Sequence, residues 1–176
     1  MKALIAHSLS KGYTPNMLKS ILTINDSQAE YLVKRLDNYF PSLEGKKIAI
    51  LGLSFKPDTD DIRESPALKI INSLLNKGAN IVAHDPMAIP TTKLIYGEQV
   101  DFASDFKEAL NAASAVFVVT SWKDYKSINA NDFKNLMANP IVVDCRHIYD
   151  QNVMEDIIHL VPGLKSLQIS SYLELG

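Results

Sequence analysis

Charged side chains crowd one short segment of the sequence. Nine consecutive residues, 56 to 64, contain two basic, four acidic and one hydroxyl side chain: Lys56, Asp58, Thr59, Asp60, Asp61, Arg63 and Glu64. Ser65 followed by Pro66 is typical of the residues that cap and begin a helix. The unpaired N–H groups of a helix N-terminus bind anions, so Lys56 and Arg63 beside it indicate a site for phosphate.

The two cations suit different parts of such a ligand. Lys56 is a point charge that can meet phosphate or sugar oxygens, whereas the guanidinium of Arg63 can form paired hydrogen bonds with a pyrophosphate. The alternative is a solvated loop whose charges pair with one another, with Arg63 bound to Asp60 or Glu64. The spacing of the residues leaves both interpretations open.

The same loop lacks the features of two other ligand sites. The dinucleotide fingerprint GxGxxG is absent, because Gly52 is the only glycine between Gly45 and Gly78. We therefore expect the main dinucleotide site to lie elsewhere. The acidic residues suggest magnesium, but the adjacent carboxylates of Asp60 and Asp61 do not readily point at one ion, so we expect no metal site.

Short apolar runs alternate with amphipathic stretches after Gly45. The runs predict buried strands at residues 47–55, 80–84, 115–121 and 141–145, and the stretches predict helices at 66–77, 105–113 and 130–138. This alternation is typical of an α/β fold with a doubly wound, Rossmann-like parallel sheet. Such sheets bind ligands at the carboxyl ends of their strands. We expect that edge to collect the loops after Phe55, Asp85, Ser121 and Cys145.

A long α-helical segment is predicted ahead of this sheet, from Asn16 to Phe40. Its apolar residues recur at intervals of three and four, which is typical of an amphipathic helix. Thr14 is the expected cap, Pro15 the expected first helical residue, and Pro41 the residue that stops the helix. The apolar stripe would be exposed in a monomer, which indicates pairing with a second copy.

Composition limits the classes of partner. Eighteen basic and twenty acidic residues give a formal charge of -2, so no global positive field is available to hold nucleic acid or an anionic membrane. Cys145 is the single cysteine, which excludes an intrachain disulfide, and the four histidines show no zinc-ligand spacing. The opening residues are too short and polar for a membrane span. We expect a cytoplasmic protein with no membrane association.

Several single residues suggest a chemical role that a structural role explains better. Cys145 ends an apolar run without a neighbour that activates its thiol, so we expect a packed residue and not a nucleophile. His84 and His147 are expected to be hydrogen-bonded surface residues. Trp122 and Tyr125 could stack on a base, but closing the sheet edge is the favoured role.

The segment GLSFKPDTDDIRESPA, residues 52–67, resembles the loop motif that opens the carboxy-terminal domain of the UDP-glucose and GDP-mannose dehydrogenase family. Further resemblance lies in TINDSQAEYLVKRL, VAHDP, TSWKDY and VVDCRHIYD, and together these segments span most of residues 14–150. The resemblance implies that residues 1–44 end a central helical dimerisation domain. It implies that residues 45–176 form a domain that binds the UDP part of a nucleotide sugar.

The family resemblance also implies roles for individual residues. Phe55, Lys56 and Arg146 would contact the nucleotide-sugar substrate. For Arg146, the alternative is a surface ion pair with Asp144 or Asp150.

Members of this family use NAD as cofactor, bound mainly by an amino-terminal domain that this chain does not contain. Arg63 would reach across an interdomain cleft to that NAD. Family members oxidise a sugar CH2OH to a carboxylate in two NAD-dependent steps through a cysteine thiol, which lies in a glycine-rich motif that is absent here. We therefore expect no catalytic residue in this chain and no turnover by the chain alone.

The resemblance leaves substrate and assembly to be decided. We expect UDP-glucose as the substrate of the full-length protein, with GDP-mannose or a UDP-N-acetylhexosamine as alternatives. A homodimer through the helix at 16–40 is implied. A stand-alone nucleotide-binding regulatory module is the alternative of another class. The tail at 153–176 departs from the family patterns, and its docking is left open.

Overall fold

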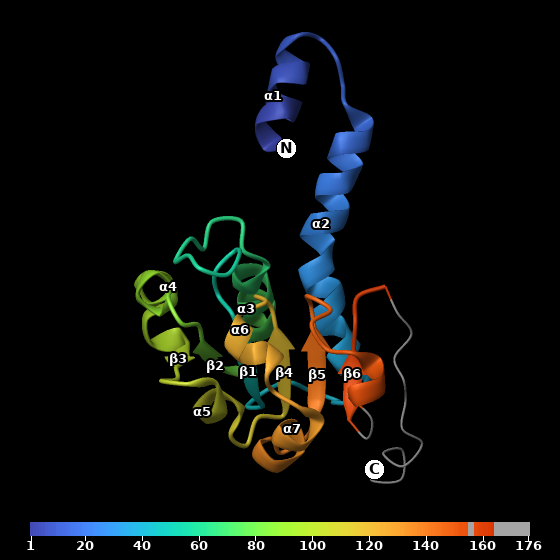
Figure 1. Ribbon diagram of the computed structural model, residues 1–176. Coiled ribbons are helices and arrows are strands. Elements are labelled where there is room, and N and C mark those ends of the chain that lie inside the picture. Colours follow the sequence, from blue (N-terminus) through green and yellow to red (C-terminus); the bar gives the residue numbers. More distant parts are fainter. Residues whose placement is uncertain (155–156, 164–176) are drawn as a thin grey trace.

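A six-stranded parallel sheet forms the centre of the computed structural model, which describes residues 1–154 and 157–163. Its strand order is β3-β2-β1-β4-β5-β6, so the winding of the chain reverses between β1 and β4. This order confirms the predicted doubly wound α/β class (Figure 1). The strands are β1 (Lys47–Leu51), β2 (Asn80–His84), β3 (Asp101–Phe102), β4 (Ala115–Val118), β5 (Ile141–Asp144) and β6 (Ile158–Leu160).

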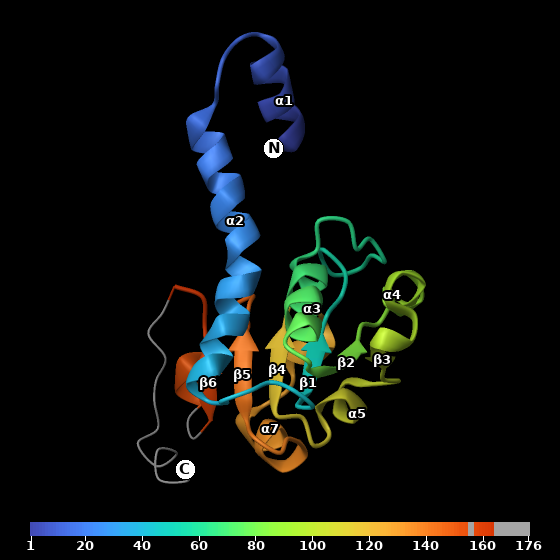
Figure 2. The same cartoon turned by 180° about the vertical axis from the view of Figure 1, so that it is seen from behind.

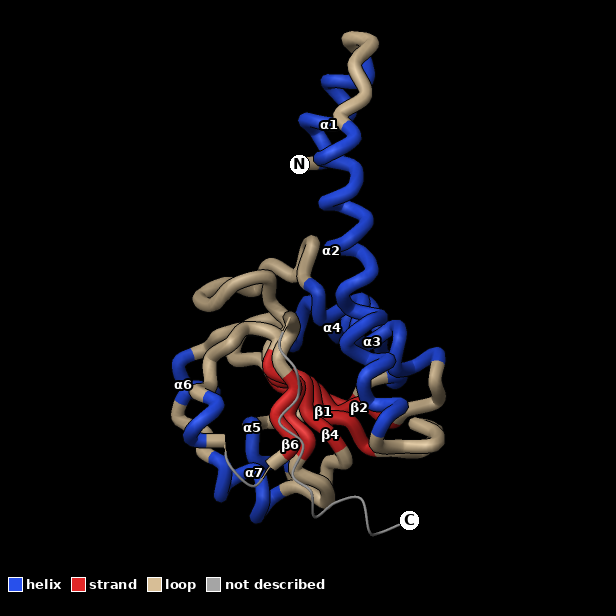
Figure 3. Tube along the Cα trace, turned by 90° about the vertical axis from the view of Figure 1, so that its right-hand side faces the viewer, coloured by secondary structure: helices blue, strands red, loops and turns tan. Residues whose placement is uncertain are grey.

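Helices cover both faces of the sheet. α2, α3 and α4 lie over one face, and α5, α6 and α7 lie over the other, as the views from behind and from the side show (Figures 2 and 3). The helices are α1 (Lys2–Ser10), α2 (Asn16–Lys34), α3 (Pro66–Asn76), α4 (Ile89–Tyr96), α5 (Phe106–Leu110), α6 (Lys123–Lys126) and α7 (Ala130–Leu136). Three short 3-10 turns complete the described elements: η1 (Arg35–Asn38), η2 (Gly97–Gln99) and η3 (Gln151–Val153).

The two faces hold two separate apolar cores because successive strand residues point in opposite directions. In β1, Ile48 and Ile50 pack with α2 and α3, whereas Ala49 and Leu51 pack with α5 and α7. All four are fully buried. A strand covered on both faces must be apolar throughout, which explains the continuous run in the sequence.

The long helix is shorter than predicted and starts differently. Pro15 precedes the first helical residue, Asn16, and no side chain caps the helix, so the prediction of a Thr14 cap with Pro15 inside the helix was wrong. Pro15 has φ -81 and ψ 76, and because this ψ is outside the helical range, Pro15 precedes the helix instead of forming its first residue. The α-helix ends at Lys34 and tightens into η1 instead of continuing to Phe40.

Only part of α2 packs on the domain. Its second half contributes Ala29, Leu32 and Val33 to the core, so the exposed stripe predicted for the whole helix is wrong for this half. The first half projects beyond the sheet together with α1 (Figures 1 and 2), and Met17 and Ile24 are 78% and 55% exposed. None of the helices in the described ranges is both long and apolar enough to cross a membrane.

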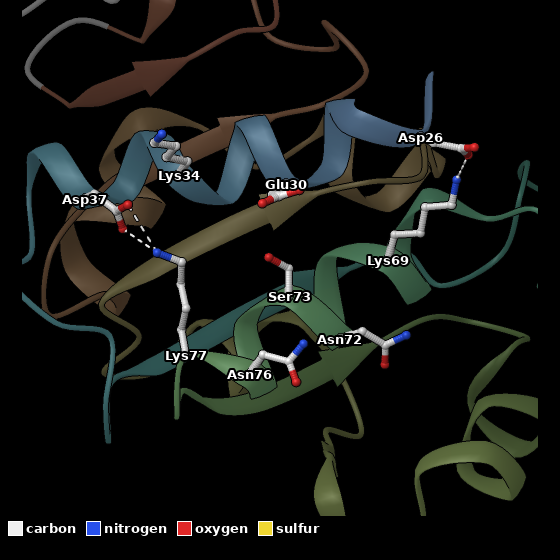
Figure 4. A pocket seen from close by; sticks show the side chains of 9 residues that line it. All are labelled: Asp26, Glu30, Lys34, Asp37, Lys69, Asn72, Ser73, Asn76 and Lys77. Atoms are coloured by element: carbon white, nitrogen blue, oxygen red, sulfur yellow. Dashed lines mark hydrogen bonds and ion pairs between the residues drawn. The ribbon is translucent and has the colours of Figure 1, made fainter. Parts of the chain in front are cut away.

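Ion pairs cross a polar groove between α2 and α3 (Figure 4). Lys69 pairs with Asp26 at one end, and the Lys77 Nζ lies 2.8 Å from Asp37 Oδ1 at the other. The groove has a volume of about 680 Å³ and is lined by charged, amide and hydroxyl side chains of α2, η1, α3 and the residue that follows α3. Exposed pairs of this kind each stabilise a fold by at most about 1 kcal/mol, so the buried apolar side of α2 dominates its attachment.

The sequence overestimated some elements and missed others. β1, β4 and β5 end before the predicted boundaries, because Leu53 and Val119 are buried in turns that follow the strands. The elements α4, α6, β3 and β6 were not predicted; β3 has two residues and β6 three, which is too short for a recognisable period. Of the tail at 153–176, residues 155–156 and 164–176 lie outside the described residues.

Candidate functional site

The loop after β1 begins with a close approach between two loops. Gly52 has φ 97, and a Cβ added there would lie 2.4 Å from the Cβ of Thr120. The Thr120 hydroxyl donates to the Ser54 carbonyl at 2.6 Å. Only glycine allows this contact, and the Thr120 side chain fills the point between β1 and β4 where a pyrophosphate could approach the backbone of a Rossmann-type sheet.

One buried carboxylate, Asp85, joins three loops at the carboxyl edge of the sheet. It follows β2 and is 2% exposed. Its Oδ2 accepts from the loops after β1 and β4, and its Oδ1 accepts from its own loop. The donors are the N–H groups of Leu53 (2.7 Å), Ser54 (3.1 Å), Met87 (2.9 Å) and Ala88 (2.8 Å), the Ser54 hydroxyl (3.1 Å) and the Trp122 indole N–H (3.1 Å).

These hydrogen bonds decide the charge of Asp85. Burial by itself would raise the pKa of this carboxyl, but the backbone N–H groups that point at it lower the pKa below its ordinary value. Asp85 is therefore ionised at neutral pH and holds the loops as an anion. Trp122, which is 8% exposed, is occupied by this bond and not presented for stacking on a base.

A second buried pair lies beside Asp85. His84 is 8% exposed, so the prediction of a surface histidine was wrong. Its Nδ1 lies 2.9 Å from the hydroxyl of Tyr125, which also lies 2.9 Å from the His84 carbonyl oxygen and can donate to it. Burial lowers the pKa of His84. The His84 side chain is buried because β2 is an interior strand of the sheet. The prediction of a surface position relied on the polarity of histidine and overlooked the place of the strand.

Phe55 and Arg146 meet at the mouth of the loops. The Arg146 Nε donates to the Val119 carbonyl at 2.6 Å, and its Nη2 donates to the Phe55 carbonyl at 3.2 Å. Its backbone N–H donates to Asp144, but among the described residues its guanidinium forms no ion pair with Asp144 or Asp150. Two carbonyls thus hold Arg146 beside the half-exposed ring of Phe55.

Lys56 and Arg63 lie in the same loop but are more exposed. Arg63 forms two side-chain hydrogen bonds with Asp61, at 2.9 and 2.8 Å, and not with Asp60 or Glu64. These hydrogen bonds lower the pKa of Asp61 to about 2, and the charge of Lys56 contributes a smaller lowering. Glu64 instead pairs with Lys2 of α1 at 2.7 Å.

A cleft of about 580 Å³ lies where this loop meets α1, α2 and the loop after β5. Phe55, Arg146 and Cys145 line it from the sheet side, and Lys56 and Arg63 are not among its lining residues. The opposite wall is formed mainly by α2: Leu22, Asn25, Asp26, Gln28, Ala29 and Leu32. Apolar side chains of α2, the ring of Phe55 and the guanidinium of Arg146 line the cleft together with polar and acidic groups, among them Asp26 and Glu64. The end beside Phe55 and Arg146 has the aromatic ring and the cation that suit an organic anion. The groove of Figure 4 contains no residue of the carboxyl-edge loops.

Comparison with known proteins identifies the family of this chain. Residues 49–151 match the UDP binding domain of the UDP-glucose/GDP-mannose dehydrogenase family, and this range contains most of β1, the charged loop and Arg146. The chain belongs to the UDP-glucose/GDP-mannose dehydrogenase family. The resemblance found in its motifs is therefore confirmed.

Named relatives in this family agree with the match. The chain is 34% identical over 153 residues to the UDP-glucose 6-dehydrogenase TuaD of Bacillus subtilis, covering 87% of this chain and 33% of that protein. It is 38% identical over 146 residues to the UDP-glucose 6-dehydrogenase AglM of Haloferax volcanii, covering 83% and 33%. The chain spans about a third of the length of these relatives.

A solved structure of the family has the same fold. The UDP-glucose dehydrogenase of the hyperthermophilic archaeon Pyrobaculum islandicum superposes with a TM-score of 0.78 at 29% identity, covering 90% of this chain and 34% of that one.

The organising residues of this family domain were missed in the sequence. Asp85 was expected only to precede a loop at the ligand edge and to belong to the motif VAHDP, and no role was predicted for Thr120 or Ser54. A signal was present for Asp85, since an aspartate directly after a buried strand lies at the ligand edge of a parallel sheet. Thr120 gave no such signal, because its contact with Gly52 joins residues that are distant in sequence.

Cys145 is packed, as predicted. It is partly buried against the core on the α2 side, and burial raises the pKa of its thiol to about 12. His147 is exposed, with φ 52, and its side chain has no hydrogen bond within the described residues. In that part of the chain no group of three or more His, Cys, Asp or Glu residues is placed to hold a metal ion.

Proposed function

We propose that this chain is the nucleotide-sugar-binding part of an NAD-dependent UDP-glucose 6-dehydrogenase. The full enzyme would oxidise UDP-glucose to UDP-glucuronate in two steps. The membership of the family and the UDP-glucose 6-dehydrogenases among its relatives support this function. The division into a helical segment at 1–44 and a UDP-binding domain at 45–176 is part of the proposal.

The meeting of Phe55 and Arg146 at one cleft is the observation that carries the proposal. They belong to loops after β1 and β5, and a guanidinium–carbonyl hydrogen bond of 3.2 Å joins them. The ring of Phe55 offers an apolar face to the base or sugar. The guanidinium N–H groups of Arg146 that are not held by carbonyls can donate to the diphosphate.

Lys56 adds a second cation at the rim of this site. It follows Phe55 directly and is exposed, so its ammonium group can move to a sugar or phosphate oxygen without breaking a hydrogen bond to any residue that the structure describes. A flexible point charge of this kind adds attraction without demanding one geometry. We therefore assign Lys56 to the substrate, together with Phe55 and Arg146.

We assign Arg63 to NAD. Thr120 occupies the point beside Gly52 where a pyrophosphate would approach the backbone, so the residues of this domain fit a single contact to NAD and not a complete dinucleotide site. Bound NAD supplies the hydride acceptor for oxidation of the sugar. Arg63 is 88% exposed at its side chain, and Asp61 holds one edge of its guanidinium, leaving the other edge for a phosphate.

The proposal includes a cytoplasmic homodimer that pairs through the helix at 16–40. The exposed first half of α2 supports this, with Met17 and Ile24 each more than half exposed, and Tyr31 in the second half is exposed to a similar extent. Burying apolar side chains of this size is the usual driving force of association. Analytical ultracentrifugation is the direct measurement of this assembly.

Titration of the chain with UDP-glucose tests the proposed function. We expect saturable binding by calorimetry, weakened about tenfold by Arg146→Lys, because a charged hydrogen bond contributes about 1.5–3 kcal/mol. Lys56→Ala should weaken binding about threefold, as expected for an exposed charge. Lys93→Ala, an exposed lysine on α4, is the matched control and should bind like the wild type. A folded wild-type chain that shows no response at millimolar UDP-glucose would contradict the proposal.

A further inference from the structure

Asp144, the last residue of β5, shapes the loop that carries Arg146. Its side chain is fully buried. Asp144 Oδ1 accepts from the Arg146 N–H at 3.0 Å, and Oδ2 accepts from the Tyr149 N–H at 3.0 Å. The carboxylate therefore closes the backbone of residues 145–149 into a turn at the edge of the candidate cleft.

His159 is the buried neighbour of this carboxylate. It lies in β6 opposite Val142 of β5 and is 4% exposed. Its Nε2 is 3.6 Å from Asp144 Oδ2, just beyond hydrogen-bond distance, and within the described residues neither ring nitrogen has a hydrogen-bond partner. A buried imidazole without partners is costly, so an interaction with the nearby carboxylate is its available compensation.

Apart from Asp144, the ring of His159 has few polar neighbours among the described residues. The Tyr149 ring meets it edge to face, with centroids 6.3 Å apart. Arg35 of η1 reaches the end of β6, where its Nη1 donates to the Val161 carbonyl at 2.9 Å. Burial would raise the pKa of Asp144, but His159 and the N–H groups of Tyr149 and Arg146 lower it. The facing groups in the described part of the chain are thus Asp144 and Tyr149, with Arg35 at the strand end.

We infer that His159 is a positioning residue, which acts through Asp144 to hold the Arg146 loop against the candidate cleft. The path has three contacts: the ring beside Asp144, Asp144 to the Arg146 N–H, and the guanidinium of Arg146 to the Phe55 carbonyl. The Tyr149 hydroxyl also donates to the Tyr125 carbonyl at 2.8 Å, which anchors the far end of the turn. The functional consequence of this inference rests on the proposed function of Arg146.

Two variants of the full chain separate positioning from simple packing. His159→Gln keeps a side-chain N–H for Asp144, whereas His159→Leu fills the site with an apolar group. We expect the leucine variant to shift the amide NMR signals of Arg146 and Tyr149 and to weaken UDP binding about fivefold, because the buried carboxylate that shapes the turn loses its neighbouring imidazole. The glutamine variant should keep both the two amide signals and the affinity for UDP close to the wild type. The control is His147→Asn in the same loop, because asparagine tolerates the φ of 52 at this position. It should leave the amide signals of Arg146 and Tyr149 close to their wild-type chemical shifts.

The opposite order of effects overturns the inference. If His159 only fills space, leucine is tolerated and glutamine is not. Absence of UDP binding by the wild type would reject the proposed function, while the amide signals of the two variants would still decide the role of His159.

Discussion

Replacing Asp85 with asparagine changes one carboxylate that three loops share. Its two oxygens accept hydrogen bonds from backbone, hydroxyl and indole donors, and the side chain is almost completely buried. Asparagine has nearly the same shape but has one acceptor oxygen and an NH2 group in place of the second. If that oxygen stays toward Met87 and Ala88, the NH2 group faces the donors of Leu53, Ser54 and Trp122.

The size of the effect follows from the donors left without an acceptor. Each buried donor that loses its partner costs about 1–3 kcal/mol. The costs do not add fully, because the donors share one oxygen and can relax together, so we expect a total loss of about 3–5 kcal/mol. For a chain of this length that corresponds to a fall in melting temperature of roughly 10 °C or more.

The effect should also depend on pH, because hydrogen bonding lowers the pKa of Asp85 in the folded protein. A carboxyl whose folded pKa lies below its unfolded value of about 3.9 contributes its full stabilisation above that value. The contribution is lost as the pH falls toward the folded pKa. The stability difference between wild type and Asp85→Asn should therefore stay constant above about pH 5 and shrink below about pH 4.

Urea unfolding followed by circular dichroism and by tryptophan fluorescence measures this difference. Trp122 is the only tryptophan in the chain and donates to Asp85, so its fluorescence reports the site directly. Asp124→Asn, at an exposed aspartate on α6, is the matched control and should cost about 0.5 kcal/mol or less. A loss below about 1 kcal/mol for Asp85→Asn, or a difference that does not shrink in acid, would refute the reasoning.

Two further predictions concern the same edge of the sheet. Gly52→Ala should destabilise the fold by about 3 kcal/mol or more in urea unfolding, because its Cβ would overlap Thr120. The control Gly45→Ala should cost about 1 kcal/mol, because Gly45 has φ 68 but open space around its Cα. Equal losses of stability in the two variants would contradict the overlap. In the folded chain, Cys145 should react with a thiol reagent at pH 8 at least about 100-fold more slowly than in the urea-unfolded chain, because burial raises the pKa of its thiol to about 12. Rapid reaction of the folded chain would show an accessible thiolate and contradict this prediction.

The fold could be predicted where the signal is local. Apolar runs placed β1, β2, β4 and β5, and the pair Ser65–Pro66 placed the start of α3, where the Ser65 hydroxyl accepts from the Ala67 N–H. The ends of the strands were less predictable, because a buried residue in a turn looks like a strand residue in the sequence. Leu53 is such a residue.

For the candidate site, too, the sequence predicted what depends on local patterns and not the contacts between distant residues. The density of charge after β1 identified the loop, and the motifs identified Phe55, Lys56, Arg63 and Arg146 as its candidate ligands. Which of them meet was not predictable. Phe55 and Arg146 are 91 positions apart and touch because β1, β4 and β5 are parallel neighbours in the sheet.

The sequence alone determined the class of fold, the position of the charged loop and the family, because periodicity, capping residues and motifs are local patterns. The tertiary structure decided the state of each polar group: Asp85 as an anion among six donors, Arg146 tied to two carbonyls, and His159 buried beside Asp144. Burial and hydrogen bonding arise between segments that are distant in the chain, and these set the charge and geometry with which a side chain meets a ligand.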